Sequence, residues 1–167
     1  RFESLSWQDA VRLAGRVSGD STVAHAVAFC MAAERASGCV PPLRAGYLRA
    51  IMIERERIAN HLGDIGAICN DTGLVFLSSQ FSILREKALR TNRRVFGHRL
   101  MMDCVTPGGV VMDISPTEVT NILEEINMLN AEFERLVRIY DENPSLEDRV
   151  YGTGVLDPET AKALGVV

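Results

Sequence analysis

The sequence predicts an all-α protein, a helical bundle. Apolar residues recur every three or four positions through most of its 167 residues, and helix-capping and helix-breaking residues separate these runs. No stretch alternates apolar and polar residues as a half-buried strand would. With 47% hydrophobic residues the chain can form a core, so we expect one domain over residues 1–167. Because it starts at Arg1 and ends at "ALGVV", we expect an internal fragment of a longer protein.

Charge and hydropathy exclude two classes of partner. The net charge is -4, and the 18 basic and 22 acidic residues are intermixed, so no basic stripe favours a nucleic acid. No run reaches the ~18 apolar residues that a membrane span needs, and no signal segment opens the chain. Any membrane association is therefore expected to go through a partner.

The four cysteines are far apart and lie within apolar runs. A reduced cysteine in such a run behaves as a small hydrophobic residue. The pattern predicts core thiols in a cytosolic protein rather than disulfides. The residues concerned are Cys30, Cys39, Cys69 and Cys104.

The first two helices are expected at residues 7–17 and 21–37. Ser6 is a suitable N-cap for the first helix. The second reads "STVAHAVAFCMAAERAS", apolar almost all round, which is typical of a helix buried on every side. Gly38 ends it, and a double proline prevents its continuation.

The remaining chain predicts longer helices separated by turns. No proline interrupts residues 43–71, which form one helix about 40 Å long. A further helix is expected at 75–101, and "TPGGV" then gives a turn with a short extended segment. Later helices begin at Ser115-Pro116 and run to about 140, begin again near Ser145, and follow an N-cap at Asp157.

Several charged residues occupy positions where the pattern expects apolar ones. Along the long helix, spacings of three and four pass through Glu54 and His61, so both should face the core or a partner. Arg57 lies within pairing distance of either. The network is either a buried ion pair that fixes helix register or a charged lining for a proton path or cofactor pocket. Glu34 and His25 raise the same question in the second helix, where a lone histidine is more often a core residue than a ligand.

Two other features allow an interface. Arg44 follows the double proline at a helix start, where its side chain could reach a neighbouring subunit or remain solvated. The Gly-Gly turn at 106–110 can approach another chain closely, but it lacks the glycine spacing and Lys-Ser/Thr of a phosphate loop.

The run "RVSGDSTVAH" has the spacing of a metal site, with serine where soft ligands would stand. Together with "PPLRAGYLRAIMIERERIANHLGDIGAI", "TPGGV" and "YGTGVLDPE", it makes the chain resemble the large subunit of the membrane-bound, energy-converting (group 4) [NiFe]-hydrogenases and formate hydrogenlyase. That family is similar to the 49 kDa subunit of respiratory NADH:quinone oxidoreductase, complex I. The resemblance covers nearly the whole chain and implies the helical-bundle fold of these subunits.

In the hydrogenases that this chain resembles, the first metal motif is Cys-Gly-x-Cys-x-x-x-His. The matching residues here are Ser18, Gly19, Asp20, Ser21 and His25, so both thiolates are replaced by hydroxyls. Nickel and low-valent iron need soft sulfur donors, and we therefore expect no metal site. The respiratory relatives use the equivalent cavity for quinone, with a tyrosine that is replaced here by Gly19.

The resemblance implies an electron-transfer subunit of a hydrogenase-related, NADH dehydrogenase-like membrane complex. A non-catalytic subunit bridging the iron–sulfur subunit and the membrane arm is the alternative, and a true nickel enzyme or a quinone- or NAD-binding subunit is less favoured. Expected partners are a small iron–sulfur subunit, membrane-arm subunits and a second copy of the fragment, on the inner face of the cell membrane. No cofactor is expected in this fragment, and quinone is possible in the full complex. Candidate site residues are Ser18, Gly19, Asp20, Ser21, His25, Glu34, Arg44, Glu54, Arg57 and His61.

Overall fold

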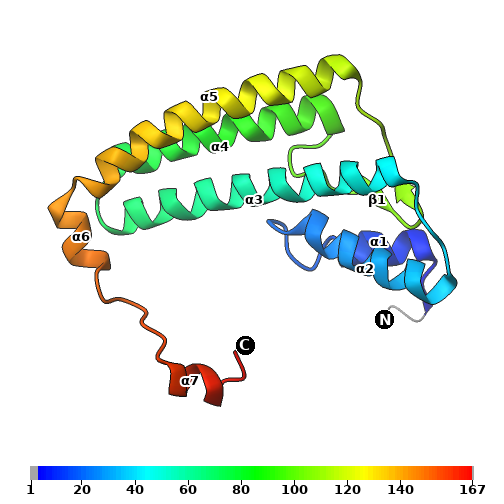
Figure 1. Ribbon diagram of the computed structural model, residues 1–167, viewed down its shortest axis with the longest axis horizontal. Coiled ribbons are helices and arrows are strands. Elements are labelled where there is room, and N and C mark those ends of the chain that lie inside the picture. The colour runs from blue at the N-terminus through cyan, green and yellow to red at the C-terminus, as the bar shows by residue number, and fades with distance from the viewer. Residues whose placement is uncertain (1–3, 167) are drawn as a thin grey trace.

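The computed structural model describes residues 4–166, which form seven helices and one small hairpin (Figure 1). The all-α prediction is confirmed. The elements in order are α1 (Trp7–Ala14), α2 (Thr22–Ser37), α3 (Leu43–Asp71), α4 (Val75–Phe96), β1 (Val105–Thr106), β2 (Gly109–Val110), α5 (Pro116–Asp141), α6 (Pro144–Val150) and α7 (Pro158–Ala163).

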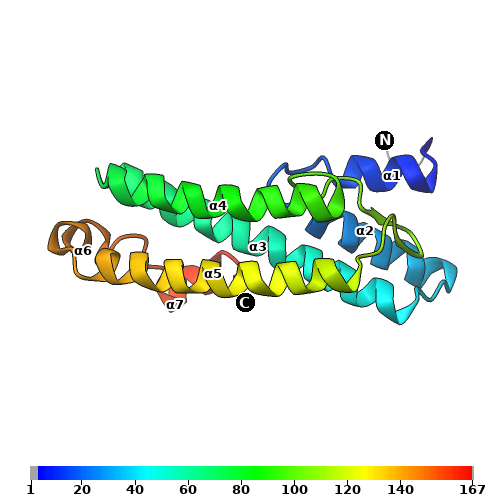
Figure 2. The same ribbon diagram turned by 90° about the horizontal axis from the view of Figure 1, so that it is seen from above.

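Three long helices make the body of the protein. α3, α4 and α5 run side by side in both views, with α4 in contact with the other two (Figures 1 and 2). α1 and α2 pack together at the N-terminal end of α3, and the β1–β2 hairpin lies against α2 and α3. α7 lies apart from the bundle (Figure 1). The long bundle therefore supports a smaller α1–α2 unit at one end.

Each part has its own apolar core. One cluster joins α1, α2 and the hairpin to α3 and includes Val23, Cys30 and Met52. The other lies between α3, α4 and α5 and is centred on Phe81, whose ring meets that of Phe133 edge-on at 6.2 Å. Burial of these side chains holds the α1–α2 unit against the bundle.

Most predicted boundaries agree with the structure, and two are wrong. α2 ends at a left-handed Gly38, and α5 begins with a capping box in which Ser115 and Glu118 bond each other's backbone N–H. α1 stops at Ala14 rather than residue 17, where Gly15 allows a close approach to Thr22. α4 stops at Phe96 rather than residue 101, because Gly97 takes a positive φ of 78°.

The face of α3 that packs inward differs from the predicted one. Glu54 and His61 are both exposed, so the prediction that they face the core is wrong, and the alternative that they face a partner stays a prediction. The buried positions also repeat every three or four residues, but they lie one position further along the helix. They are Ala45, Leu48, Arg49, Met52, Arg55, Glu56, Ala59, Leu62, Gly66 and Cys69.

Two further burial predictions need correction. α2 is not buried all round, because its small residues Ala24, Ala28 and Ala32 face outward. Cys39 is exposed, whereas the other three cysteines are buried. Among residues 4–166, no helix is both long enough and apolar enough to cross a membrane.

Candidate functional site

The predicted ligand loop connects α1 to α2 and is accessible. Ser18 and Ser21 are half-buried, and Gly19 and Asp20 are exposed. His25 is half-buried in the first turn of α2, where its backbone N–H donates to the carbonyl of Ser21 at 3.1 Å. The structure thus brings these five predicted residues together at one helix N-terminus.

A carboxylate from α3 caps this helix. The backbone N–H groups of Val23 and Ala24 donate to Glu56 Oε2 and Oε1 at 2.7 and 3.0 Å. Ser21, at the usual capping position, makes no side-chain cap. Glu56 therefore satisfies N–H groups that the helix itself cannot bond, and its charge lies at the positive end of the helix dipole.

Glu56 is buried without an arginine or lysine partner among the described residues. It is 7% exposed, and this burial raises the pKa of its carboxyl group. The two N–H donors and nearby His25 oppose that shift, whereas the charge of Asp20 adds to it. Burial is the larger influence, so the ionised carboxylate is held here at an energetic cost.

The backbone of Asp20 is fixed by a second residue of α3. Asn60, one turn after Glu56, donates from Nδ2 to the carbonyl oxygen of Asp20 at 2.8 Å. From α4, Arg85 brings Nη2 to 3.4 Å from Asp20 Oδ1 and donates from Nε to the carbonyl of Ala59 at 3.1 Å. The loop is consequently attached to two helices of the bundle.

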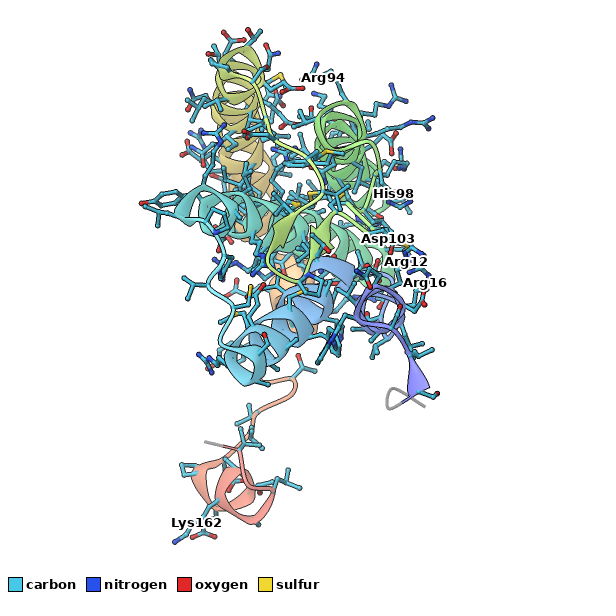
Figure 3. The ribbon with its side chains drawn as sticks, turned by 90° about the vertical axis from the view of Figure 1, so that its right-hand side faces the viewer. Arg12, Arg16, Arg94, His98, Asp103 and Lys162 are labelled. Atoms are coloured by element: carbon cyan, nitrogen blue, oxygen red, sulfur yellow. The ribbon has the colours of Figure 1, made fainter. Side chains whose placement is uncertain are left out.

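The beginning of the loop is attached to the chain after α4. Arg16 donates from both terminal nitrogens to the two carboxylate oxygens of Asp103, each at 2.8 Å. Figure 3 shows these two side chains together, with Arg12 and His98 beside them. The arginine lowers the pKa of Asp103, which takes a positive φ of 62°. This two-bond geometry fixes direction as well as distance.

A polar cavity of about 400 Å³ opens beside the loop. Its wall combines carboxylates, an amide, a hydroxyl and a guanidinium, which suit water or a small polar ligand better than an apolar one. The lining residues are Asp20, Ser21, Asn60, Gly63, Asp64 and Arg85.

The opposite end of α2 is joined to α3 by a buried ion pair. Arg49 Nη2 and Nη1 donate to Glu34 Oε1 and Oε2 at 2.6 and 3.0 Å, and both side chains are less than a tenth exposed. Arg49 also donates to the carbonyls of Thr106 and Gly109, and Gly108 N–H donates to Glu34. Arg49 lowers the pKa of Glu34. Glu34 is therefore buried and paired, and the pair joins α2, α3 and the hairpin; a role of Glu34 in a functional site stays a prediction.

A second buried charge pair lies inside the bundle. Arg55 Nη2 is 2.8 Å from Glu125 Oε2, and Arg55 Nε donates to Asn92 Oδ1 at 2.5 Å. Neither oxygen of Glu125 has an aligned hydrogen bond, although both are buried. The attraction between the two residues is therefore mainly ionic, and it ties α3 to α4 and α5.

The other predicted candidates lie outside the loop. Arg57 does pair with Glu54, at 2.6 Å, but both side chains are more than half exposed. His61 is exposed and lies in the groove between α3 and α5. Arg44 pairs with Asp113 of the same chain at 2.7 Å, and its contact with another subunit stays a prediction.

Sequence reasoning missed the buried charges of α3, which are Arg49, Arg55 and Glu56. A signal was present, because small and apolar residues recur on the true buried face at Ala45, Ala59 and Leu62. The competing stripe had equally good spacing, and no local rule separated the two.

The residues at the loop do not fit a nickel–iron centre. Ser18 and Ser21 offer hydroxyls, which are poorly ionised at neutral pH and hard compared with thiolates. Within residues 4–166, no three His, Cys, Asp or Glu side chains are placed to hold a metal ion. The loop therefore lacks the donors that such a centre needs.

Known proteins share both the sequence pattern and the fold of this chain. Residues 71–167, more than half of the chain, match the family described as "Respiratory-chain NADH dehydrogenase, 49 Kd subunit". The chain belongs to this family.

The relatives include hydrogenases as well as respiratory proteins. Hydrogenase-4 component G of Escherichia coli (strain K12) is 31% identical over 96% of this chain and 29% of its own length. Formate hydrogenlyase subunit 5 of the same strain is 30% identical over 95% of this chain and 28% of its own. A component of the NADH-quinone oxidoreductase of Roseiflexus sp. (strain RS-1) is 32% identical over 87% of this chain and 39% of its own. The chain thus spans less than a third of the two E. coli relatives.

A solved structure shares the fold. A chain in the membrane-bound sulfane sulfur reductase, described as an archaeal respiratory membrane complex, aligns with a TM-score of 0.88 and 21% identity. The alignment covers 95% of this chain and 43% of the other. It supports the predicted helical architecture.

Proposed function

We propose that this chain is part of an electron-transfer subunit in a hydrogenase-related, NADH dehydrogenase-like membrane complex, and that it acts without a nickel site. The supporting observation is the loop of residues 18–21. It keeps a backbone attached by long-range bonds and an adjacent polar cavity. It carries Ser18 and Ser21 at the positions where the metal motif of the hydrogenases that this chain resembles has cysteines. A loop fixed by long-range bonds is suited to holding an acceptor in a defined place.

The proposed partners are a small iron–sulfur subunit, which would supply the cluster, and membrane-arm subunits. Relatives are named as components of hydrogenase and NADH-quinone oxidoreductase complexes, which favours such an assembly. Val40, Leu43 and Tyr47 are 87%, 75% and 64% exposed near the start of α3, as on a surface that another polypeptide covers. The proposed location is the inner face of the cell membrane, with quinone as a possible acceptor. The same apolar surface favours self-association of the isolated chain.

Metal analysis of the purified intact complex tests the nickel-free proposal. We expect iron from the partner's cluster and nickel well below one equivalent per complex. Stoichiometric nickel that remains with this chain after the complex is separated would contradict it.

The electron-transfer role is tested with Asp20→Asn and His25→Gln in the assembled complex. We expect turnover to fall while the composition of the complex stays constant, because both side chains lie at the loop. Glu132→Gln is a matched surface control, since Glu132 pairs with Arg135 of its own helix, α5, away from the loop. Unchanged turnover in both loop variants would favour the alternative, a structural subunit that bridges the iron–sulfur subunit and the membrane arm.

A further inference from the structure

Glu56 is not among the predicted site residues, yet its side chain bonds directly to the backbone at the start of α2, beside the candidate site. It is the only described residue of α3 whose side chain accepts from the backbone of α2, through Val23 and Ala24. Because Glu56 and Val23 are 33 positions apart, the bonds fix tertiary structure rather than local helix geometry.

We propose that Glu56 is a positioning residue: its ionised carboxylate fixes the first turn of α2, and so holds the loop at 18–21 and the ring of His25 in place. This inference rests on the proposed function, since the loop matters only if it carries the site. The charge state of Glu56 then determines how firmly the site is held.

The hydrogen-bond geometry favours the ionised form, because a carboxylate is a stronger acceptor than a neutral carboxyl group. Each carboxylate oxygen accepts one N–H, at 2.7 and 3.0 Å, so both oxygens are used as acceptors. A protonated carboxyl group has one O–H donor and a reduced capacity to accept. Protonation therefore weakens the bond to the protonated oxygen, and the N–H of Val23 or Ala24 that it accepts from is held less firmly.

The surroundings of Glu56 raise its pKa through burial and act on it through two neighbouring charges. Two other titratable groups face Glu56: His25 from α2, whose positive form would stabilise the carboxylate, and Asp20 from the loop, whose charge opposes it. Arg85 of α4 approaches Asp20 at 3.4 Å and reduces that opposition. The unpaired burial of Glu56 raises its pKa above the ordinary value of 4.5.

A structural role alone would favour a different residue. A buried carboxylate without a basic partner costs folding energy, and an uncharged residue or a serine cap would satisfy part of the same helix end at less cost. Ser21 is already at the capping position and is not used. With an ionisable group at this position, the attachment of the helix end depends on its protonation state.

Amide hydrogen exchange in the full chain tests the proposal without any electron acceptor. In Glu56→Gln we expect the protection factors of Val23 and Ala24 to fall about tenfold at neutral pH. Glu54→Gln, on the exposed face of the same helix, is the matched control and should leave both amides unchanged. Equal protection in the wild type and Glu56→Gln would overturn the proposal.

The pH profile separates positioning from simple packing. In the wild type, protection of these two amides should be lost as pH falls through the raised pKa of Glu56, and in Glu56→Gln it should be low at every pH. His25→Gln is titrated alongside to remove the contribution of the imidazole. A wild-type profile without this transition would also overturn the proposal, and it can be measured even if Glu56→Gln does not fold.

The positioning role and the electron-transfer role fail in different ways. If exchange behaves as expected but loop variants leave turnover unchanged, the positioning role stands and the electron-transfer role fails. If exchange is unaffected by Glu56→Gln while loop variants abolish turnover, the reverse holds.

Discussion

The two ends of α2 are attached to α3 by carboxylates of opposite character. At the C-terminal end, Glu34 is paired with Arg49, and the pair binds the hairpin as well. At the N-terminal end, Glu56 accepts from backbone N–H groups. The pKa of Glu34 is lowered by its arginine, and that of Glu56 is raised by burial. The C-terminal end of α2 is therefore attached by a compensated charge pair. The N-terminal end, beside the candidate site, is attached by a buried charge whose desolvation costs free energy.

The largest effect on the free energy of unfolding is expected from breaking the Glu34–Arg49 pair. Arg49→Met leaves Glu34 buried without its counter-charge, and removal of one partner of a buried pair costs roughly 3–5 kcal/mol. Urea denaturation should show this loss in the free energy of unfolding. The double variant with Glu34→Leu should recover much of it, because an apolar pair no longer leaves a buried charge. A single-variant loss below about 1 kcal/mol would mean that the pair does not hold the two helices.

The sequence predicted the helices much better than it predicted how Glu34 and Glu56 attach the two ends of α2. Caps and breakers such as Gly38 and Ser115 act through neighbouring residues, so local rules locate them. The partner of Glu56 is the backbone of a helix 33 positions away, and that of Glu34 is Arg49, which the pattern placed on no particular face. Such pairings depend on how helices pack, which spacing alone does not determine.

The pH dependence of stability should have opposite signs at the two ends. The pKa of Glu34 is lowered, so its contribution is present above its unfolded value of about 4.5 and is lost as pH falls through the folded value. The pKa of Glu56 is raised, so its contribution is present below about 4.5 and is lost as pH rises through the folded value. Protonation of Glu56 weakens its bonds to α2, but the relief of its desolvation outweighs that local loss in the total free energy.

These signs are measured as the slope of unfolding free energy against pH. In the wild type, Glu56 should make the free energy of unfolding decline as pH rises above about 4.5, and Glu56→Gln should remove this decline. Glu34 should make the same free energy decline as pH falls below about 4.5, and Glu34→Gln should remove that decline. If both substitutions flatten the same part of the curve, the two carboxylates do not differ in the way described.

A smaller effect on stability is expected from replacing glycines of α3 by alanine, and it should differ between Gly46 and Gly63. Gly46→Ala adds a methyl group to open space and should stabilise the helix by roughly 0.5–1 kcal/mol. At Gly63 the added Cβ would lie 3.2 Å from Arg85 Nε, so the gain is offset by displacing the guanidinium. The Arg85 Nε–H, which donates to the carbonyl of Ala59, should then exchange faster in NMR spectra. Equal stabilisation at both positions, with that proton unchanged, would show that the arginine does not need the glycine.

The smallest effect is expected at Glu54, where the sequence pattern had indicated a buried network. Its side chain is 54% exposed and that of Arg57 is 61% exposed, so water screens the pair and already solvates both charges. Glu54→Gln should therefore change the unfolding free energy by only about 0–1 kcal/mol. Because Glu54 and Glu56 are two positions apart on one helix, they face in different directions, and a glutamine at each position compares a solvated carboxylate with a buried one. Thermal unfolding of the two variants side by side measures this directly. A loss of about 3 kcal/mol or more at Glu54 would restore the buried-network hypothesis, since only removal of a desolvated partner costs that much.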